Sequence, residues 1–189
     1  MMEVLKRKLM VFIGVETSGP DPEKHEIVEF SAIFGKQNGE GLHLVGAITG
    51  AVKPVHLETA DKETLKNTTF NQKVWSVFAR DLKTIMTRFV DKMGDTLLRE
   101  KLDGVVLIAH GMAKKSEFLG KAFREADLFG KINFDVFDIM DIADQGGFGG
   151  WTFDMLCAYF GVPDGIPPHR AQKDAYLAFS VFNGIMNDK

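Results

Sequence analysis

The sequence has 189 residues, of which 45% are hydrophobic and 26% are charged, values that exclude disordered, collagen-like and low-complexity chains. The formal net charge of -3 excludes a strongly basic nucleic-acid coat but leaves room for a local basic groove, because a summed charge says nothing about its distribution. A single cysteine excludes an internal disulfide and indicates a reducing compartment. The apolar runs of the sequence are too short for a signal sequence or a membrane span. We therefore expect one cytoplasmic domain over residues 1–189 that does not enter a membrane.

The first third of the chain predicts three strands. Residues 9–13 form a continuous apolar run, which is typical of a central strand buried on both faces. After a turn cluster at residues 18–22, residues 27–34 alternate at strand period, and residues 42–53 form a third extended segment that Pro54 ends. The short links between these segments predict an antiparallel meander.

The rest of the chain alternates predicted helices and strands. Hydrophobic residues at helical spacing indicate the helices, and short apolar runs indicate the strands. In chain order we expect a helix over 74–102, a strand over 105–109, a helix over 115–127, a strand over 134–137, a short helix after 152 and a helix over 170–186. This order predicts an α/β fold with a mixed five-stranded sheet, in which three antiparallel strands are followed by parallel β-α units and helices flank the sheet.

Two details complete the second half of the chain. The glycine-rich segment 146–150 lacks the Lys-Ser/Thr pair of a phosphate-binding loop, so we interpret it as a flexible connector. Thr152 is expected to cap the short helix that follows, and Asp138 and Asp141 are interpreted as acids at a helix start.

Three segments, kept in order along the chain, resemble the DnaQ-like 3′–5′ exonucleases with a catalytic histidine, a family of the ribonuclease H-like superfamily. Residues 12–19 read FIGVETSG and are followed by IVEFSAI at 27–33. Residues 107–119 read LIAHGMAKKSEFL, and residues 169–175 read HRAQKDA. The likeness spans nearly the whole chain and is therefore more specific than any single short pattern. It implies a ribonuclease H-like exonuclease fold.

The resemblance also implies a chemistry. Such enzymes cut a terminal phosphodiester with two divalent ions about 3.5–4 Å apart, such as Mg²⁺ or Mn²⁺, which four carboxylates hold. The first strand supplies two carboxylates at i and i+2, because that spacing places both on one face, and a histidine activates the attacking water. On this pattern Glu16 is the second carboxylate, Asp174 is the fourth and His169 is the base.

Two positions depart from the family pattern. Gly14 stands in place of the first carboxylate and offers no ligand, and Lys115 stands in place of the third and reverses its charge. We therefore expect that two-metal binding is absent and that at most one Mg²⁺ or Mn²⁺ binds weakly to Glu16 and Asp174. We expect the Lys115 ammonium to lie beside these two carboxylates and neutralise them; a side chain pointing to solvent, more than about 6 Å from both, would contradict this.

The resemblance further implies a set of contacts to nucleic acid. The residues expected to make them are Thr17, Ser18, His110, Lys114, Lys115 and Arg170. The lysine pair would supply sequence-independent affinity for phosphates; a solvated helix start is the alternative. His110 follows a strand and is expected to orient backbone rather than to bind a metal.

Three functions remain open from the sequence. The first is a degenerate exonuclease, a binding or scaffolding module that partners single-stranded nucleic acid or a nucleic-acid-processing protein. The second is a weak exonuclease that uses one ion with Glu16, Asp174 and His169, and the third is a protein-interaction domain without nucleic acid. Restoring the carboxylates with Gly14→Asp and Lys115→Asp is expected to raise activity if the cleft is otherwise intact.

Overall fold

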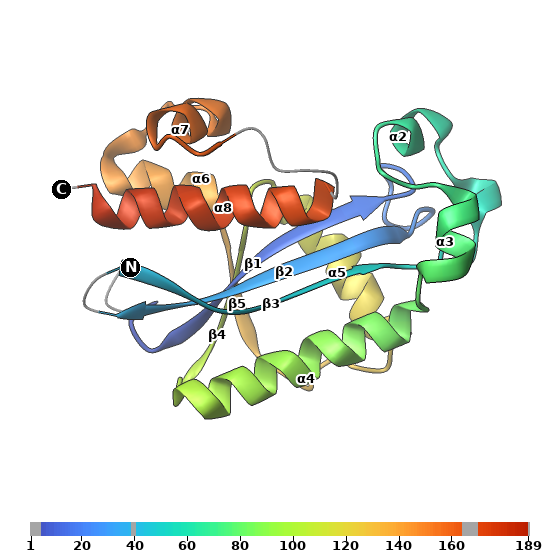
Figure 1. The fold of residues 1–189 in the computed structure, drawn as a ribbon, viewed down its shortest axis with the longest axis horizontal. Coiled ribbons are helices and arrows are strands. Elements are labelled where there is room, and N and C mark those ends of the chain that lie inside the picture. Colours follow the sequence, from blue (N-terminus) through green and yellow to red (C-terminus); the bar gives the residue numbers. More distant parts are fainter. Residues whose placement is uncertain (1–4, 39–40, 164–169, 189) are drawn as a thin grey trace.

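A mixed sheet forms the centre of the computed structural model, which describes residues 5–38, 41–163 and 170–188. Its strands are β1 (Lys8–Thr17), β2 (Ile27–Asn38), β3 (Gly41–Ala51), β4 (Gly104–Ala109) and β5 (Phe134–Asp138), in the spatial order β3-β2-β1-β4-β5. β1, β2 and β3 pair antiparallel, whereas β4 and β5 run parallel to β1 (Figure 1). The predicted α/β architecture with five strands is confirmed.

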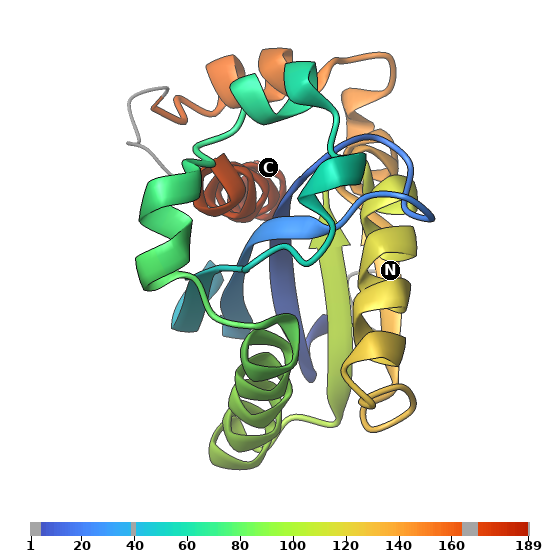
Figure 2. The same cartoon turned by 90° about the vertical axis from the view of Figure 1, so that its right-hand side faces the viewer.

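Helices cover both faces of this sheet (Figures 1 and 2). They are η1 (Leu57–Thr59), α2 (Lys62–Lys66), α3 (Gln72–Phe78), α4 (Leu82–Glu100), α5 (Met112–Glu125), α6 (Ile139–Ala143), a single π-turn η2 (Asp144–Phe148), α7 (Phe153–Tyr159) and α8 (Arg170–Asn187). α4 and α5 pack on one face, and α6 and α8 on the other. None of the helices described is both long and apolar enough to cross a bilayer.

The side chains of β1 point alternately to the two faces of the sheet and so belong to two separate parts of the core. Leu9, Val11 and Ile13 belong to the cluster under α4 and α5, whereas Met10 and Phe12 belong to the cluster under α8. All five side chains are fully buried, because β1 is central and covered on both faces. β1 therefore fixes α8 relative to the rest of the sheet.

The helix predicted over 74–102 is wrong in one respect, because the structure divides it into α3 and α4. Ala79 is extended, and the Arg80 backbone N–H donates to the Ala51 carbonyl at 3.0 Å. Asp81 then begins α4 by accepting a hydrogen bond from Thr84 N at 2.7 Å. Pairing with the end of β3 thus interrupts a pattern that is locally compatible with one helix.

The segment between β5 and α7 is more regular than predicted. The sequence missed α6, which Asp138 caps by accepting from Met140 N at 3.0 Å, and this confirms Asp138 as a helix-start acid. The glycine-rich connector forms the π-turn η2, in which Gly147 adopts a φ of 98° that favours glycine. The predicted cap of α7 is confirmed, since Thr152 Oγ1 accepts from Met155 N at 3.2 Å.

Candidate active-site cleft

The carboxyl end of β1 presents the first motif to α8. Phe12, Gly14 and Glu16 share one sheet face by strand period, and the Phe12 ring lies 5.3 Å from that of Phe179 and 5.4 Å from that of Phe182, both on α8. Glu16 is half-buried at the end of this row. α8 also carries Asp174, so the second and fourth carboxylates predicted from the family pattern come from facing elements.

At Gly14 the backbone of α8 comes unusually close. A Cβ on Gly14 would lie 1.8 Å from the carbonyl oxygen of Ala171, closer than any non-bonded contact allows. The helix can approach this far because Ala171, Ala175 and Ala178 are small and fully buried. The space where the family has its first carboxylate is therefore filled by helix backbone, a feature the sequence analysis did not foresee.

Lys115 and Asp174 form an ion pair between α5 and α8. Lys115 Nζ, from the first turns of α5, lies 2.9 Å from Asp174 Oδ2 on α8. The lysine side chain is 14% exposed and the aspartate side chain 41%, so limited access of water strengthens a charge-assisted bond of this length. The expectation that Lys115 lies beside Asp174 is confirmed, and its proximity to Glu16 stays a prediction.

A further carboxylate lies in the same region and was missed from the sequence. Glu29 is paired with Glu16 in the β1–β2 register and is 1% exposed. Its Oε2 accepts a hydrogen bond from Thr69 Oγ1 at 2.9 Å, which ties the segment between α2 and α3 to the cleft. The available signal was a glutamate inside the apolar strand sequence IVEF, since acids are rarely buried without a structural or chemical reason.

Two of the residues expected to contact nucleic acid stabilise the turn after β1. Thr17 Oγ1 donates to the Gly19 carbonyl at 2.8 Å. Ser18 is fully buried, and its Oγ accepts from Glu26 N at 2.9 Å. In this conformation Ser18 holds the turn together, and a contact with nucleic acid would require the turn to open.

The remaining residues of that set differ in their surroundings. Lys114 is exposed next to the partly buried ion pair. His110 is exposed at the end of β4, and its ring stacks on Phe153 with centroids 4.3 Å apart and planes 10° from parallel. His169 and the Arg170 side chain lie outside the described residues.

The described residues do not fit the two-metal centre of the family. Within the ranges described, no three histidine, cysteine, aspartate or glutamate side chains are grouped so that they could hold a metal ion. The Lys115 ammonium is paired with Oδ2 of Asp174, and the backbone of α8 fills the space beside Gly14. At two of the four ligand positions that the resemblance implies, Gly14 and Lys115 therefore offer no side-chain oxygen to a cation.

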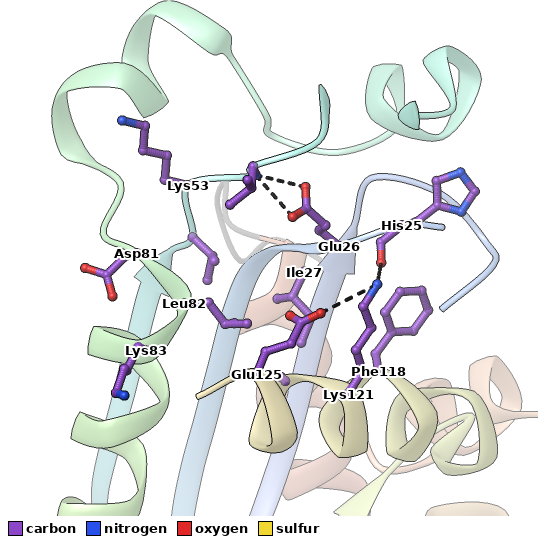
Figure 3. Close-up of a pocket in the computed structure, with 13 residues that line it drawn as sticks. His25, Glu26, Ile27, Lys53, Asp81, Leu82, Lys83, Phe118, Lys121 and Glu125 are labelled. Carbon is purple, nitrogen blue, oxygen red and sulfur yellow. Dashed lines mark hydrogen bonds and ion pairs between the residues drawn. The ribbon is translucent and has the colours of Figure 1, made fainter. Parts of the chain in front are cut away.

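A separate pocket lies on the other face of the sheet, between the start of β2, the start of α4 and α5 (Figure 3). Its volume is about 260 Å³. Lys121 Nζ donates to the carbonyls of Pro22 at 2.9 Å and His25 at 3.2 Å, and Glu26 accepts from the backbone N–H of Val55 and His56. These charged groups hold neighbouring loops in place, and the pocket is not part of the cleft.

The fold is similar to solved exonuclease structures. Escherichia coli exonuclease I in complex with a dT13 oligonucleotide matches with a TM-score of 0.72 at 12% identity, over 95% of this chain and 41% of that chain. The zinc-ion-bound form of an E. coli exonuclease I–ssDNA complex has a TM-score of 0.67 at 13% identity, over 92% and 39% of the respective chains. Exonuclease I from Methylocaldum szegediense has a TM-score of 0.66 at 13% identity, over 92% and 40%.

These likenesses establish the fold. No family model and no curated protein matches the sequence. The chain spans about two fifths of the length of the exonuclease I chains cited here. At such low identity a shared architecture does not transfer activity. The predicted ribonuclease H-like exonuclease fold is therefore confirmed, and what the cleft does follows from its own residues.

Proposed function

We propose that this chain is a degenerate DnaQ-like 3′–5′ exonuclease domain that binds single-stranded nucleic acid, or scaffolds a nucleic-acid-processing protein, without two-metal cleavage. The observation that carries the proposal is the 2.9 Å ion pair between Lys115 and Asp174. The solved neighbours bound to oligonucleotides support the nucleic-acid part of it.

The ion pair acts against a divalent cation in two ways. A cation bound at Asp174 would have to displace the Lys115 ammonium, which is largely shielded from water. If the ammonium stayed within a few ångströms, repulsion would cost on the order of several kcal/mol even at an effective dielectric near 20. We propose that Lys115 takes over the charge-neutralising role that the metal ions have in the family.

A nucleic-acid strand can bind without bound metal ions or cleavage. Lys114 is exposed beside the cleft and would attract phosphates irrespective of base sequence. Thr17, His110, Lys115 and Arg170 complete the proposed contact set, with Glu16 and His169 as remnants of the catalytic pattern. A single weakly held Mg²⁺ or Mn²⁺ at Glu16 and Asp174 is the alternative that the experiment below decides.

The test combines binding and cleavage on one oligonucleotide. We expect a 3′-labelled single strand to bind with an affinity that falls as salt rises, and to keep its length with Mg²⁺ or Mn²⁺ present. Shortening that disappears in both Glu16→Gln and His169→Ala would contradict the proposal and establish an exonuclease. An absence of binding at low salt would contradict the proposed binding of single-stranded nucleic acid.

A further inference from the structure

The short helix α3 exposes an apolar face. Val74, Val77 and Phe78 are 44%, 69% and 71% exposed, although all three are large hydrophobic side chains. Their spacing of i, i+3 and i+4 places them on one side of the helix. Trp75, on the other side, is 5% exposed and buried against β2. One side of α3 is therefore packed against the sheet through Trp75, and the other side is exposed to solvent.

α3 is anchored to β2, the strand that carries Glu29. Trp75 Nε1 donates to the Val28 carbonyl at 2.9 Å, and Thr69, three residues before α3, binds Glu29. Val28 and Glu29 are neighbours in β2, and Glu29 is paired with Glu16. Two views place α3 near the end of α8 that begins at residue 170 (Figures 1 and 2). The exposed face is thus held at a fixed position relative to the cleft.

Positive charge accompanies the apolar face. Lys73 is exposed on the same side of α3, next to Val77 by helical spacing. Lys53 lies beside the segment that follows α3, since its backbone N–H donates to the Arg80 carbonyl at 2.8 Å. Neither lysine forms an ion pair with an acid among the described residues. Figure 3 shows the Lys53 amine pointing away from the neighbouring pocket.

The size and charge of the surface favour a nucleic-acid strand over a protein. α3 has seven residues and is about 10 Å long, so its face is far smaller than the roughly 800 Å² per partner of a stable protein interface. One or two bases fit such a length. An exposed phenyl ring on the same short helix as Lys73, with Lys53 at the segment that follows the helix, is a combination that can bind single strands, because bases stack on the ring and phosphates meet the cations.

We propose that Phe78, with Val74 and Val77, is a stacking platform for the bases of a single strand whose phosphates contact Lys53 and Lys73. The inference rests on the proposed function and extends it from the cleft to the path of the strand. Stacking accepts every base, so the platform recognises single-strandedness rather than sequence.

The experiment compares two exposed phenylalanines. Phe78→Ala is expected to weaken binding of a single-stranded oligonucleotide about tenfold or more, as loss of a base–aromatic stack does. Phe129→Ala is the control: Phe129 is 73% exposed but precedes β5, which runs parallel to β1, so it lies at the opposite end of the sheet and its loss should leave affinity unchanged. Unfolding curves of both variants check that the fold is intact.

An abasic oligonucleotide isolates stacking from charge. Wild type and Phe78→Ala should bind it equally, whereas Lys73→Ala should weaken binding to both oligonucleotides. The platform is overturned if wild type and Phe78→Ala bind the normal strand with equal affinity. It is also overturned if Phe78→Ala loses as much affinity for the abasic strand as for the normal strand. Either result leaves the proposed function standing. Failure of the wild type to bind any strand overturns both.

A second variant reports contact directly. Phe78→Trp retains an aromatic ring at the proposed platform and adds an exposed indole whose fluorescence should fall when a base stacks on it. Wild type, which carries the buried Trp75 and the half-buried Trp151, gives the background signal to subtract. Fluorescence that is quenched by the normal strand and not by the abasic strand supports the platform, and unchanged fluorescence on saturation with the normal strand overturns it.

Discussion

The Lys115 side chain reaches across the cleft from α5 to a carboxylate on α8, and its charge decides which cations Asp174 can accept. We expect Lys115→Ala to raise the affinity for Mn²⁺ at least about tenfold, because it removes a unit positive charge from a largely buried position. Lys114→Ala removes the same charge from the exposed neighbouring position and should leave that affinity unchanged. Calorimetric titration of both variants measures the difference, and an equal response would rule out a specific role for Lys115.

Gly14 allows a second residue-scale prediction. Because a Cβ there meets the Ala171 carbonyl oxygen, Gly14→Ala is expected to lower the free energy of unfolding by about 1–3 kcal/mol or more. Gly94→Ala, in the interior of α4, meets nothing within 4 Å and should raise it by about 0.5–1 kcal/mol. Urea unfolding of the two variants tests the pair; a harmless Gly14→Ala would mean that α8 does not press on β1.

At the scale of elements, the ion pair between Lys36 on β2 and Glu100 at the end of α4 connects sheet and helix at 2.6 Å. Hydrogen bonds from Lys36 and Arg99 hold the pKa of Glu100 below its ordinary value of 4.5. The stability that this pair contributes is complete above pH 4.5 and is lost as the pH falls through the lowered pKa. Glu100→Gln should therefore be less stable than wild type at neutral pH, and the difference should shrink in strong acid as Glu100 becomes protonated.

The matched control for that prediction is Glu117→Gln on α5. Glu117 is exposed, and its substitution should have little effect at either pH. Thermal unfolding at the two pH values measures both variants. A difference between Glu100→Gln and wild type that persists in acid would mean that packing, rather than charge, connects the two elements.

The elements also show where sequence information ends. The run at residues 9–13 predicted β1 because a central strand is apolar on both faces. Asp81, which caps α4, is a local signal for the break between α3 and α4, but neither Ala79 nor Arg80 is a helix breaker, and the break comes from pairing with β3. The family pattern was enough to predict that Lys115 lies beside Asp174. It did not predict the contact between Gly14 and the backbone of α8, because that contact depends on how closely α8 packs on β1, which three buried alanines determine.

At the scale of the molecule, the region around Gly14 and Lys115 departs in shape as well as in charge from the pattern that the resemblance implies. Gly14→Asp with Lys115→Asp, which the sequence alone predicts to raise activity in an intact cleft, should give no metal-dependent shortening of an oligonucleotide, because an aspartate at position 14 collides with the backbone of α8. The double variant should also unfold more easily than Lys115→Asp alone. Strong cleavage by the double variant would show that α8 moves aside and that the cleft is intact.

The most direct measurement is a crystal structure of the protein grown with Mn²⁺. We expect Lys115 Nζ within hydrogen-bonding distance of Asp174 and no manganese bound to that carboxylate. Manganese density bridging Glu16 and Asp174, with the lysine displaced into solvent, would contradict the replacement of metal by lysine on which the proposed function depends.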